Sequence, residues 1–80
     1  KMSGKSVFAK DYAVMLDVLI QARKSQGFSQ QYIADRLGKP QSFVSKYENG
    51  ERRLDILEFF AIAKALQKEP VQLLKQIGLL

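Results

Sequence analysis

The chain has 80 residues, of which 46% are hydrophobic, a size that allows one small domain with a single core. It contains no cysteine and no histidine, which excludes disulfides, thiolate or imidazole metal ligands, thiol nucleophiles and imidazole bases. The 13 basic and 8 acidic residues give a formal net charge of +5, which favours an anionic partner but is also an ordinary surplus for a soluble protein. We therefore expect a non-enzymatic protein without a metal or a cofactor.

No apolar run approaches the ~20 residues that a membrane-spanning helix needs, and residues 1–10 lack the apolar segment of a signal peptide. We therefore expect a cytoplasmic protein with no membrane contact. The short, polar and basic stretch 1–5 is expected to be flexible. Residues 6–80 are expected to form a single domain.

Residues 6–26 show the pattern of a long amphipathic helix, which Gly27 ends. The residues that recur near one face of this helix are Tyr12, Met15, Leu16, Leu19, Ile20 and Arg23. We interpret Tyr12 and Met15 as core residues rather than ligand contacts, because aromatic and thioether side chains at helical spacing usually pack.

The stretch 29–50 has the pattern of a helix-turn-helix. Ser29 is a suitable N-cap, since its hydroxyl accepts from the first free backbone N–H groups, and Gly38 ends the helix. The apolar residues that recur between them at helical spacing are Ile33, Ala34 and Leu37. Because Ala34 and Gly38 have almost no side chain, the next helix can cross closely over this one.

A second short helix is expected over residues 41–49. Pro40 suits its start, where no backbone N–H is needed, and Gly50 ends it. Val44 and Tyr47 lie on its inward face. The opposite face carries polar side chains of the kinds that recognise base edges, namely Gln41, Ser42, Ser45 and Lys46.

These motifs resemble the Cro and phage-repressor type of helix-turn-helix, also called the xenobiotic response element (XRE) family. The residues that carry the resemblance are Arg23, Gly27-Phe28-Ser29-Gln30, Ile33-Ala34, Leu37-Gly38, Gln41-Ser42, Val44-Ser45, Glu48-Asn49-Gly50 and Ile62-Ala63-Lys64-Ala65-Leu66. The likeness spans roughly residues 19–74. There are two departures, since the family usually has a small apolar residue in place of Lys39 and proline in place of Leu54. The resemblance implies an all-α fold, a compact five-helix lambda-repressor-like DNA-binding domain.

The resemblance also implies roles for single residues. In the family, an arginine at the place of Arg23 pairs with a glutamate at the place of Glu48; the alternative is two unrelated surface charges. The glutamine at the place of Gln30 contacts the DNA backbone and braces the first base-recognising residue, here Gln41; the alternative is a solvated helix start.

Two arginines follow the second helix of the motif. In the family this loop lies along the DNA backbone, so Arg52 and Arg53 are candidate phosphate contacts. The alternative is a pair of solvated loop charges, which Glu51 partly offsets. Lys39 places a further charge at the turn, within reach of a phosphate.

Gln41 has the donor and acceptor needed for two hydrogen bonds to adenine, whereas Ser42 and Ser45 are less selective. Lys46 suits either guanine or a phosphate. Phe43 has two interpretations, contact with a thymine methyl or sugar and packing against the first helix of the motif. The full set of expected DNA contacts is Ser29, Gln30, Lys39, Gln41, Ser42, Phe43, Ser45, Lys46, Asn49, Arg52 and Arg53.

Asp55 is a suitable cap for a fourth helix, and Pro70 opens a fifth. The inward stripe of the fourth helix is expected to be Ile56, Phe59, Ile62, Ala63 and Leu66. Apolar residues on its other flank and in the C-terminal segment are expected to pack on a second chain or partner protein, and these are Leu57, Phe60, Ile77, Leu79 and Leu80.

We therefore expect a transcriptional regulator, a repressor, that binds a pseudo-palindromic double-stranded DNA operator as a homodimer. Its helix 41–49 would occupy the major groove. The alternative is an antitoxin-like or other protein-interaction module, which would bind a partner protein through its apolar C-terminal surface.

Overall fold

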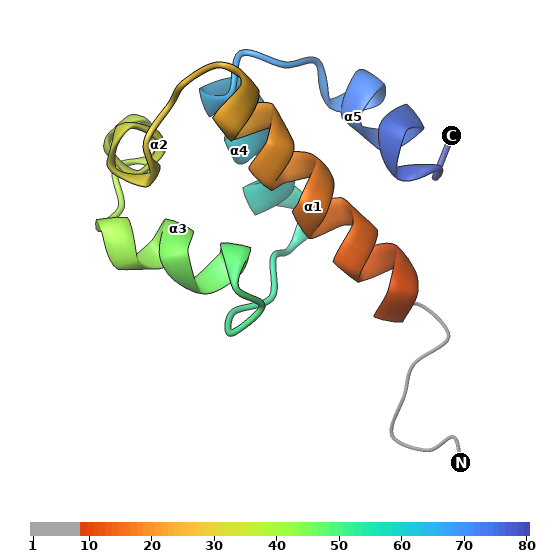
Figure 1. Cartoon of the computed structure of the whole chain (residues 1–80), viewed down its shortest axis with the longest axis horizontal. Helices are drawn as coiled ribbons and strands as arrows, with labels where there is room; N and C mark the ends of the chain where they lie inside the picture. Colours follow the sequence, from red (N-terminus) through yellow and green to blue (C-terminus); the bar gives the residue numbers. More distant parts are fainter. Residues whose placement is uncertain (1–8) are drawn as a thin grey trace.

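The computed structural model describes residues 9–80, which form five α-helices and, within that range, no strand (Figure 1). The helices are α1 (Ala9–Ser25), α2 (Gln30–Leu37), α3 (Gln41–Glu48), α4 (Ile56–Ala65) and α5 (Pro70–Ile77). The predicted all-α class with five helices is confirmed. The expected start of the first helix at residue 6, and the stretch 1–5, lie outside the described residues.

The helices pack around α1, which crosses the middle of the molecule (Figure 1). The helix-turn-helix pair α2 and α3 lies on one side of α1, and α5 lies on the other. The main contacts between helices are those of α2 with α3 and α4, of α1 with α3 and α5, and of α4 with α5. No helix within residues 9–80 has both the length and the apolar character that crossing a membrane requires.

The buried core draws on every helix. Its members are Leu19, Ala22, Ile33, Ala34, Val44, Tyr47, Phe59, Ile62, Ala63, Ala65, Leu66, Leu73 and Ile77. Met15 packs against this cluster while partly buried, and Tyr12 is half-buried. Burying each branched or aromatic side chain stabilises the fold by about 1.5–3 kcal/mol. Because α2 and α3 contribute residues to this one cluster, the same core holds them and the rest of the domain.

The helix boundaries follow from local chemistry. The Ser29 hydroxyl accepts the backbone N–H of Tyr32 at 2.9 Å, which caps α2. Asp55 and Glu58 form a reciprocal capping box at the start of α4, in which each side chain accepts the other residue's backbone N–H. Gly38 ends α2 with a φ of 68°, a left-handed conformation that glycine adopts without strain.

Two expectations about apolar residues need correction. Ile77 is only 6% exposed, because it lies four residues after Leu73 on the face of α5 that packs against α1 and α4. It belongs to the core and not to an exposed partner surface. Ile56 is 62% exposed instead of inward-facing, since it is the first residue of α4 and lies at the rim of a shallow hollow beside Tyr12 and Met15.

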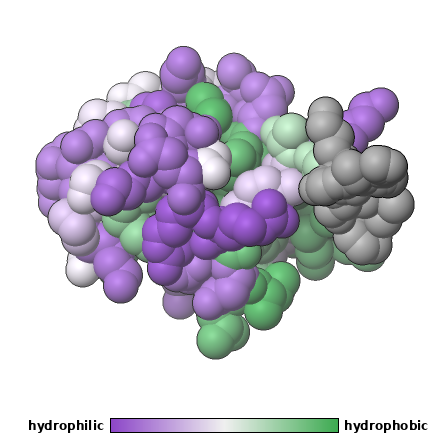
Figure 2. Space-filling model, turned by 90° about the horizontal axis from the view of Figure 1, so that it is seen from below, coloured by the Kyte–Doolittle hydropathy of each residue, from purple (hydrophilic) through white to green (hydrophobic). Residues whose placement is uncertain are grey.

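Apolar side chains remain on the surface of the C-terminal half. Leu57 is 78% exposed and Phe60 is 46% exposed, both on α4. The other large ones in this half, besides Ile56, are Val71, Leu79 and Leu80. In Figure 2, the side of the molecule where α2 and α3 lie is mostly hydrophilic, and hydrophobic groups gather next to it.

A buried ion pair ties the end of α1 to the end of α3. Arg23 Nε donates to Glu48 Oε2 at 2.7 Å and Arg23 Nη2 donates to Glu48 Oε1 at 3.0 Å. Arg23 Nη1 donates to the carbonyl oxygen of Phe28 at 2.8 Å, which also fixes the connection between α1 and α2. The two side chains are only 11% and 7% exposed, so each charge depends on the other.

Within residues 9–80, Gln67 is the one residue other than glycine that has a positive φ. Gln67 follows Leu66, the C-cap of α4; it has a φ of 60° and closes a turn in which the N–H of Lys68 donates to the carbonyl oxygen of Ala63 at 2.9 Å. This is the left-handed helix-ending conformation that usually selects glycine, and a side chain there costs free energy.

Replacing Gln67 with glycine should therefore raise the free energy of unfolding by about 0.5–1 kcal/mol, because relief of the left-handed strain exceeds the added entropy of the unfolded chain. Denaturant unfolding followed by far-UV circular dichroism measures the change. The matched control is Gln72→Gly inside α5, which should destabilise by about the same amount. Destabilisation by both substitutions would contradict the strain argument.

Replacing Glu48 with alanine should lower the free energy of unfolding by about 3–5 kcal/mol, because Arg23 then remains buried without its counter-charge. The control is Glu51→Ala, an exposed acid whose side chain bonds only to nearby Asn49, which should change stability by about 0.5 kcal/mol or less. Equal and small effects of the two substitutions would show that the pair does not hold α1 to α3.

Candidate nucleic-acid interface

The helix α3 has one buried and one polar face. Val44 and Tyr47 are buried against the core, and burial raises the pKa of the Tyr47 phenol above its ordinary value, so it stays neutral. Of the expected DNA contacts on the opposite side, the exposed ones are Gln41, Ser42 and Lys46, and Ser45 is half-buried. An eight-residue helix with such a face has the dimensions and the donor and acceptor groups that fit a major groove.

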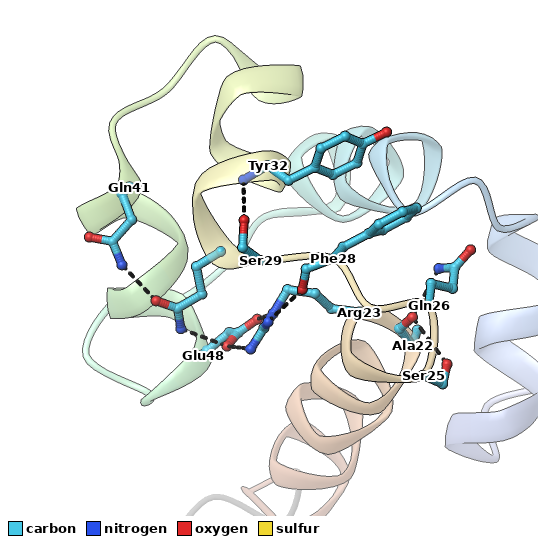
Figure 3. A network of polar contacts seen from close by, with 10 residues as sticks. Ala22, Arg23, Ser25, Gln26, Phe28, Ser29, Tyr32, Gln41 and Glu48 are labelled. Carbon is cyan, nitrogen blue, oxygen red and sulfur yellow. Dashed lines mark hydrogen bonds and ion pairs between the residues drawn. The ribbon is translucent and has the colours of Figure 1, made fainter.

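A chain of hydrogen bonds connects this polar face to the buried ion pair (Figure 3). Gln41 Nε2 donates to Gln30 Oε1 at 2.6 Å, and Gln30 Nε2 donates to Glu48 Oε1 at 2.9 Å. Glu48 in turn accepts from Arg23, and these hydrogen bonds raise the pKa of Arg23 further above its ordinary value. The structure thus brings together four residues of α1, α2 and α3 that are far apart in the sequence.

The charge on Glu48 sets the direction of every bond in this chain. An ionised carboxylate only accepts hydrogen bonds, so Gln30 must turn its amide nitrogen toward Glu48 and its oxygen toward Gln41. Gln41 must then turn its nitrogen toward Gln30. This leaves the Gln41 oxygen and one of its N–H groups available on the surface, a donor and an acceptor side by side.

Phe43 is half-buried and packs against the core cluster, with its ring 5.6 Å from the ring of Tyr47 in an edge-to-face arrangement. Two cations lie over it. The Lys39 Nζ is 5.6 Å from the centre of the ring, and the Arg52 guanidinium is 4.7 Å from it. The structure shows Phe43 packed on the core; packing against the first helix of the motif and contact with a thymine methyl or sugar both stay predictions.

The two loop arginines have different environments. Arg52 makes a two-pronged ion pair with Glu58, with Nη1–Oε1 at 3.0 Å and Nη2–Oε2 at 2.8 Å. This pairing lowers the pKa of Glu58. The Arg53 guanidinium instead lies 3.9 Å from the ring centre of Tyr12, whose hydroxyl oxygen accepts the N–H of Leu54 at 2.9 Å.

Two other expected contacts are already engaged. The Ser29 hydroxyl accepts the N–H that caps α2. Asn49 Nδ2 donates to Glu51 Oε2 at 2.7 Å, and Asn49 Oδ1 accepts the Glu51 N–H at 3.0 Å. These bonds stabilise the turn after α3, which gives Asn49 a local structural role in addition to any contact with DNA.

The sequence interpretation missed Glu58 and the second role of Tyr12. The spacing Asp55-x-x-Glu58 is itself a capping-box signature and was a usable signal for Glu58. No sequence signal shows that Tyr12 on α1 supports the loop at Leu54, because the two residues meet only in the folded chain. Within the part of the chain that the structure describes, no group of three acidic side chains is placed to hold a metal ion.

Comparison with known proteins agrees with this geometry. A helix-turn-helix family model, HTH_3, matches residues 19–73. A solved structure of an XRE-family like protein from Pseudomonas syringae pv. tomato str. DC3000 is similar, at 46% identity over 85% of this chain and 83% of that one, with a TM-score of 0.82. The restriction-modification controller protein C.AhdI from Aeromonas hydrophila is also similar, at 30% identity over 79% of this chain and 96% of that one, with a TM-score of 0.71.

No curated protein matches the sequence. The family model covers more than half of the chain, and both structural relatives share its fold over most of their length. The chain therefore belongs to the XRE-type helix-turn-helix family and is a non-enzymatic DNA-binding transcriptional regulator.

Proposed function

We propose that this regulator is a repressor that binds a specific double-stranded DNA operator as a homodimer, with α3 in the major groove of each half-site. The observation that carries the proposal is the hydrogen-bonded chain from Arg23 to Gln41, which holds one exposed amide in a defined orientation at the start of α3. A side chain that is oriented before binding loses less entropy on contact with a base, so it discriminates bases better.

Gln41 suits adenine in this orientation. Its free oxygen would accept from adenine N6, and the remaining N–H of its Nε2 would donate to adenine N7. Ser42, Ser45 and Lys46 would contact neighbouring base edges or phosphates from the same face of α3.

Phosphate contacts would flank this helix and set its position on the duplex. The groups best placed for them are Lys39 at the turn before α3, Arg53 in the loop after it, and Gln30 with the first N–H groups of α2. Each neutralised phosphate adds roughly one unit to the salt dependence of binding.

Dimerisation would use the exposed apolar residues of the C-terminal half. Leu57 and Phe60 lie three residues apart on one flank of α4, and Leu79 and Leu80 add apolar surface at the end of the chain. A two-fold dimer would place its two copies of α3 about one DNA turn, roughly 34 Å, apart. The likeness to a controller protein supports a regulatory role of this kind.

The same surface favours a second candidate function, an antitoxin-like module that binds a partner protein through the apolar C-terminal residues. The two candidates differ in what covers Leu57 and Phe60, either the same residues of a second copy or a different protein. The state of the purified chain in solution therefore separates them.

Replacing Gln41 with alanine should weaken operator binding by about 1–3 kcal/mol while leaving binding to random duplex nearly unchanged, because a base contact is lost and phosphate contacts remain. The operator is first obtained by selection from a random duplex pool, and affinities are measured by fluorescence anisotropy at several salt concentrations. The control is Gln21→Ala, an exposed glutamine on α1. Equal losses on both DNAs would remove Gln41 from base recognition.

Replacing Leu57 and Phe60 together with glutamine should lower the dimer fraction in analytical ultracentrifugation while the far-UV signal of the helices persists, because both side chains are exposed in the monomer. The control is Val14→Gln, which changes an exposed apolar residue of α1. A dimer that survives the double substitution would place the interface elsewhere. A wild-type chain that is monomeric alone and pairs with a co-expressed protein would favour the second candidate.

A further inference from the structure

Arg52 touches three parts of the domain at once. Its guanidinium makes two hydrogen bonds to the carboxylate of Glu58 on α4, at 3.0 and 2.8 Å. One of its nitrogens, Nη1, also donates to the carbonyl oxygen of Arg53 in the loop at 3.2 Å. Its Cζ atom lies 4.7 Å from the ring centre of Phe43 on α3.

The carboxylate that holds Arg52 is itself anchored. Glu58 Oε1 accepts the N–H of Asp55 at 2.9 Å, and the Asp55 side chain accepts the N–H of Glu58 at 2.7 Å. The pair is therefore fixed to the first turn of α4 and differs from two mobile surface charges. On the other side, Phe43 packs edge-to-face on the ring of Tyr47, which belongs to the core.

Through its contacts with Phe43 and Glu58, Arg52 connects α3 to α4. The helix α3 packs mainly on α1 and α2, whereas α4 packs mainly on α2 and α5. A small hollow lined by Phe43, Glu58 and Ile62 separates α3 from α4 on this side. Arg52 contacts Phe43 and Glu58, which line this hollow from α3 and α4, at a place where the two helices pack less closely than their main partners do.

From this geometry we propose that Arg52, held by Glu58, is a positioning residue that fixes α3 and the loop after it against α4, and is not one of the phosphate contacts. Two of its N–H groups are bonded to a carboxylate and a third to a backbone carbonyl oxygen, so the pair presents little net charge to DNA. Arg53 differs, since no acid among residues 9–80 pairs with it. The inference rests on the proposed DNA recognition by α3.

The variant Glu58→Gln distinguishes two effects of Glu58 on DNA binding, its positioning of α3 through Arg52 and its negative charge. Glutamine is accepted at this place of a capping box, so α4 keeps its cap, while the charged pair with Arg52 is lost. Removing a negative charge near DNA would by itself tighten binding to every sequence. If Arg52 positions α3, the substitution should instead lower the affinity for the operator, because a loosened α3 recognises the operator less well.

The experiment compares the wild-type chain with Glu58→Gln, Arg52→Lys and the matched control Glu51→Gln, on the selected operator and on random duplex. Glu51 is in the same loop but its side chain bonds only to Asn49, so its substitution should tighten binding to both DNAs slightly. Glu58→Gln and Arg52→Lys should each weaken operator binding about three- to tenfold without weakening random binding. Lysine keeps the charge but loses the planar fork, so the salt dependence should stay the same.

Tighter binding of Glu58→Gln to both DNAs, as for Glu51→Gln, would overturn the proposal and make Arg52 a phosphate contact that Glu58 masks. A further measurement needs no DNA. Amide hydrogen exchange across residues 43–54 of the free protein should accelerate in Glu58→Gln and Arg52→Lys but not in Glu51→Gln. Unchanged exchange in both variants would contradict the positioning role of Arg52. If the wild-type chain showed no preference for any operator, only the proposed function would be contradicted.

Discussion

The ion pair between Arg23 and Glu48 is the interaction on which the rest of the structure depends. It joins the ends of α1 and α3 inside a small domain, and its two charges are nearly excluded from solvent. Such a pair is costly to break, because the partner left behind is a buried charge. Its consequence reaches the surface, since the ionised Glu48 determines how the amides of Gln30 and Gln41 are turned. A core interaction thereby sets the hydrogen-bonding pattern on the exposed face of α3.

Several positive charges around α3 are held in fixed positions by glutamates or aromatic rings. The chain has a surplus of basic residues, yet Arg23 and Arg52 are both paired with glutamates. The loop cations Arg52 and Arg53 lie over the aromatic rings of Phe43 and Tyr12 respectively and make cation–π contacts with them. Paired and stacked cations hold defined positions, and cations in defined positions can fix the register and orientation of a protein on a duplex.

Much of the fold was predictable because its signals are local. The caps at Ser29 and Asp55, the glycine stop at Gly38 and the proline at the start of α5 each act within one helical turn, and the structure has all of them. The expected pairing of Arg23 with Glu48 came from the family resemblance, and the structure shows these two side chains in contact. The errors concerned apolar residues at helix ends. A helical stripe shows which residues share a face but not whether another element covers its first or last turn, as at Ile56 and Ile77.

The sequence by itself determined the helices, their ends, the polar face of α3 and the family, because periodicity and capping depend on neighbouring residues. The tertiary structure alone decided which partner each polar side chain chose. Arg52 meets Glu58 across a loop, Tyr12 meets Leu54 from another helix, and Phe43 turns toward the core instead of standing free. The physical reason is that these choices depend on distances between residues far apart in the chain, and packing sets those distances only after the helices come together.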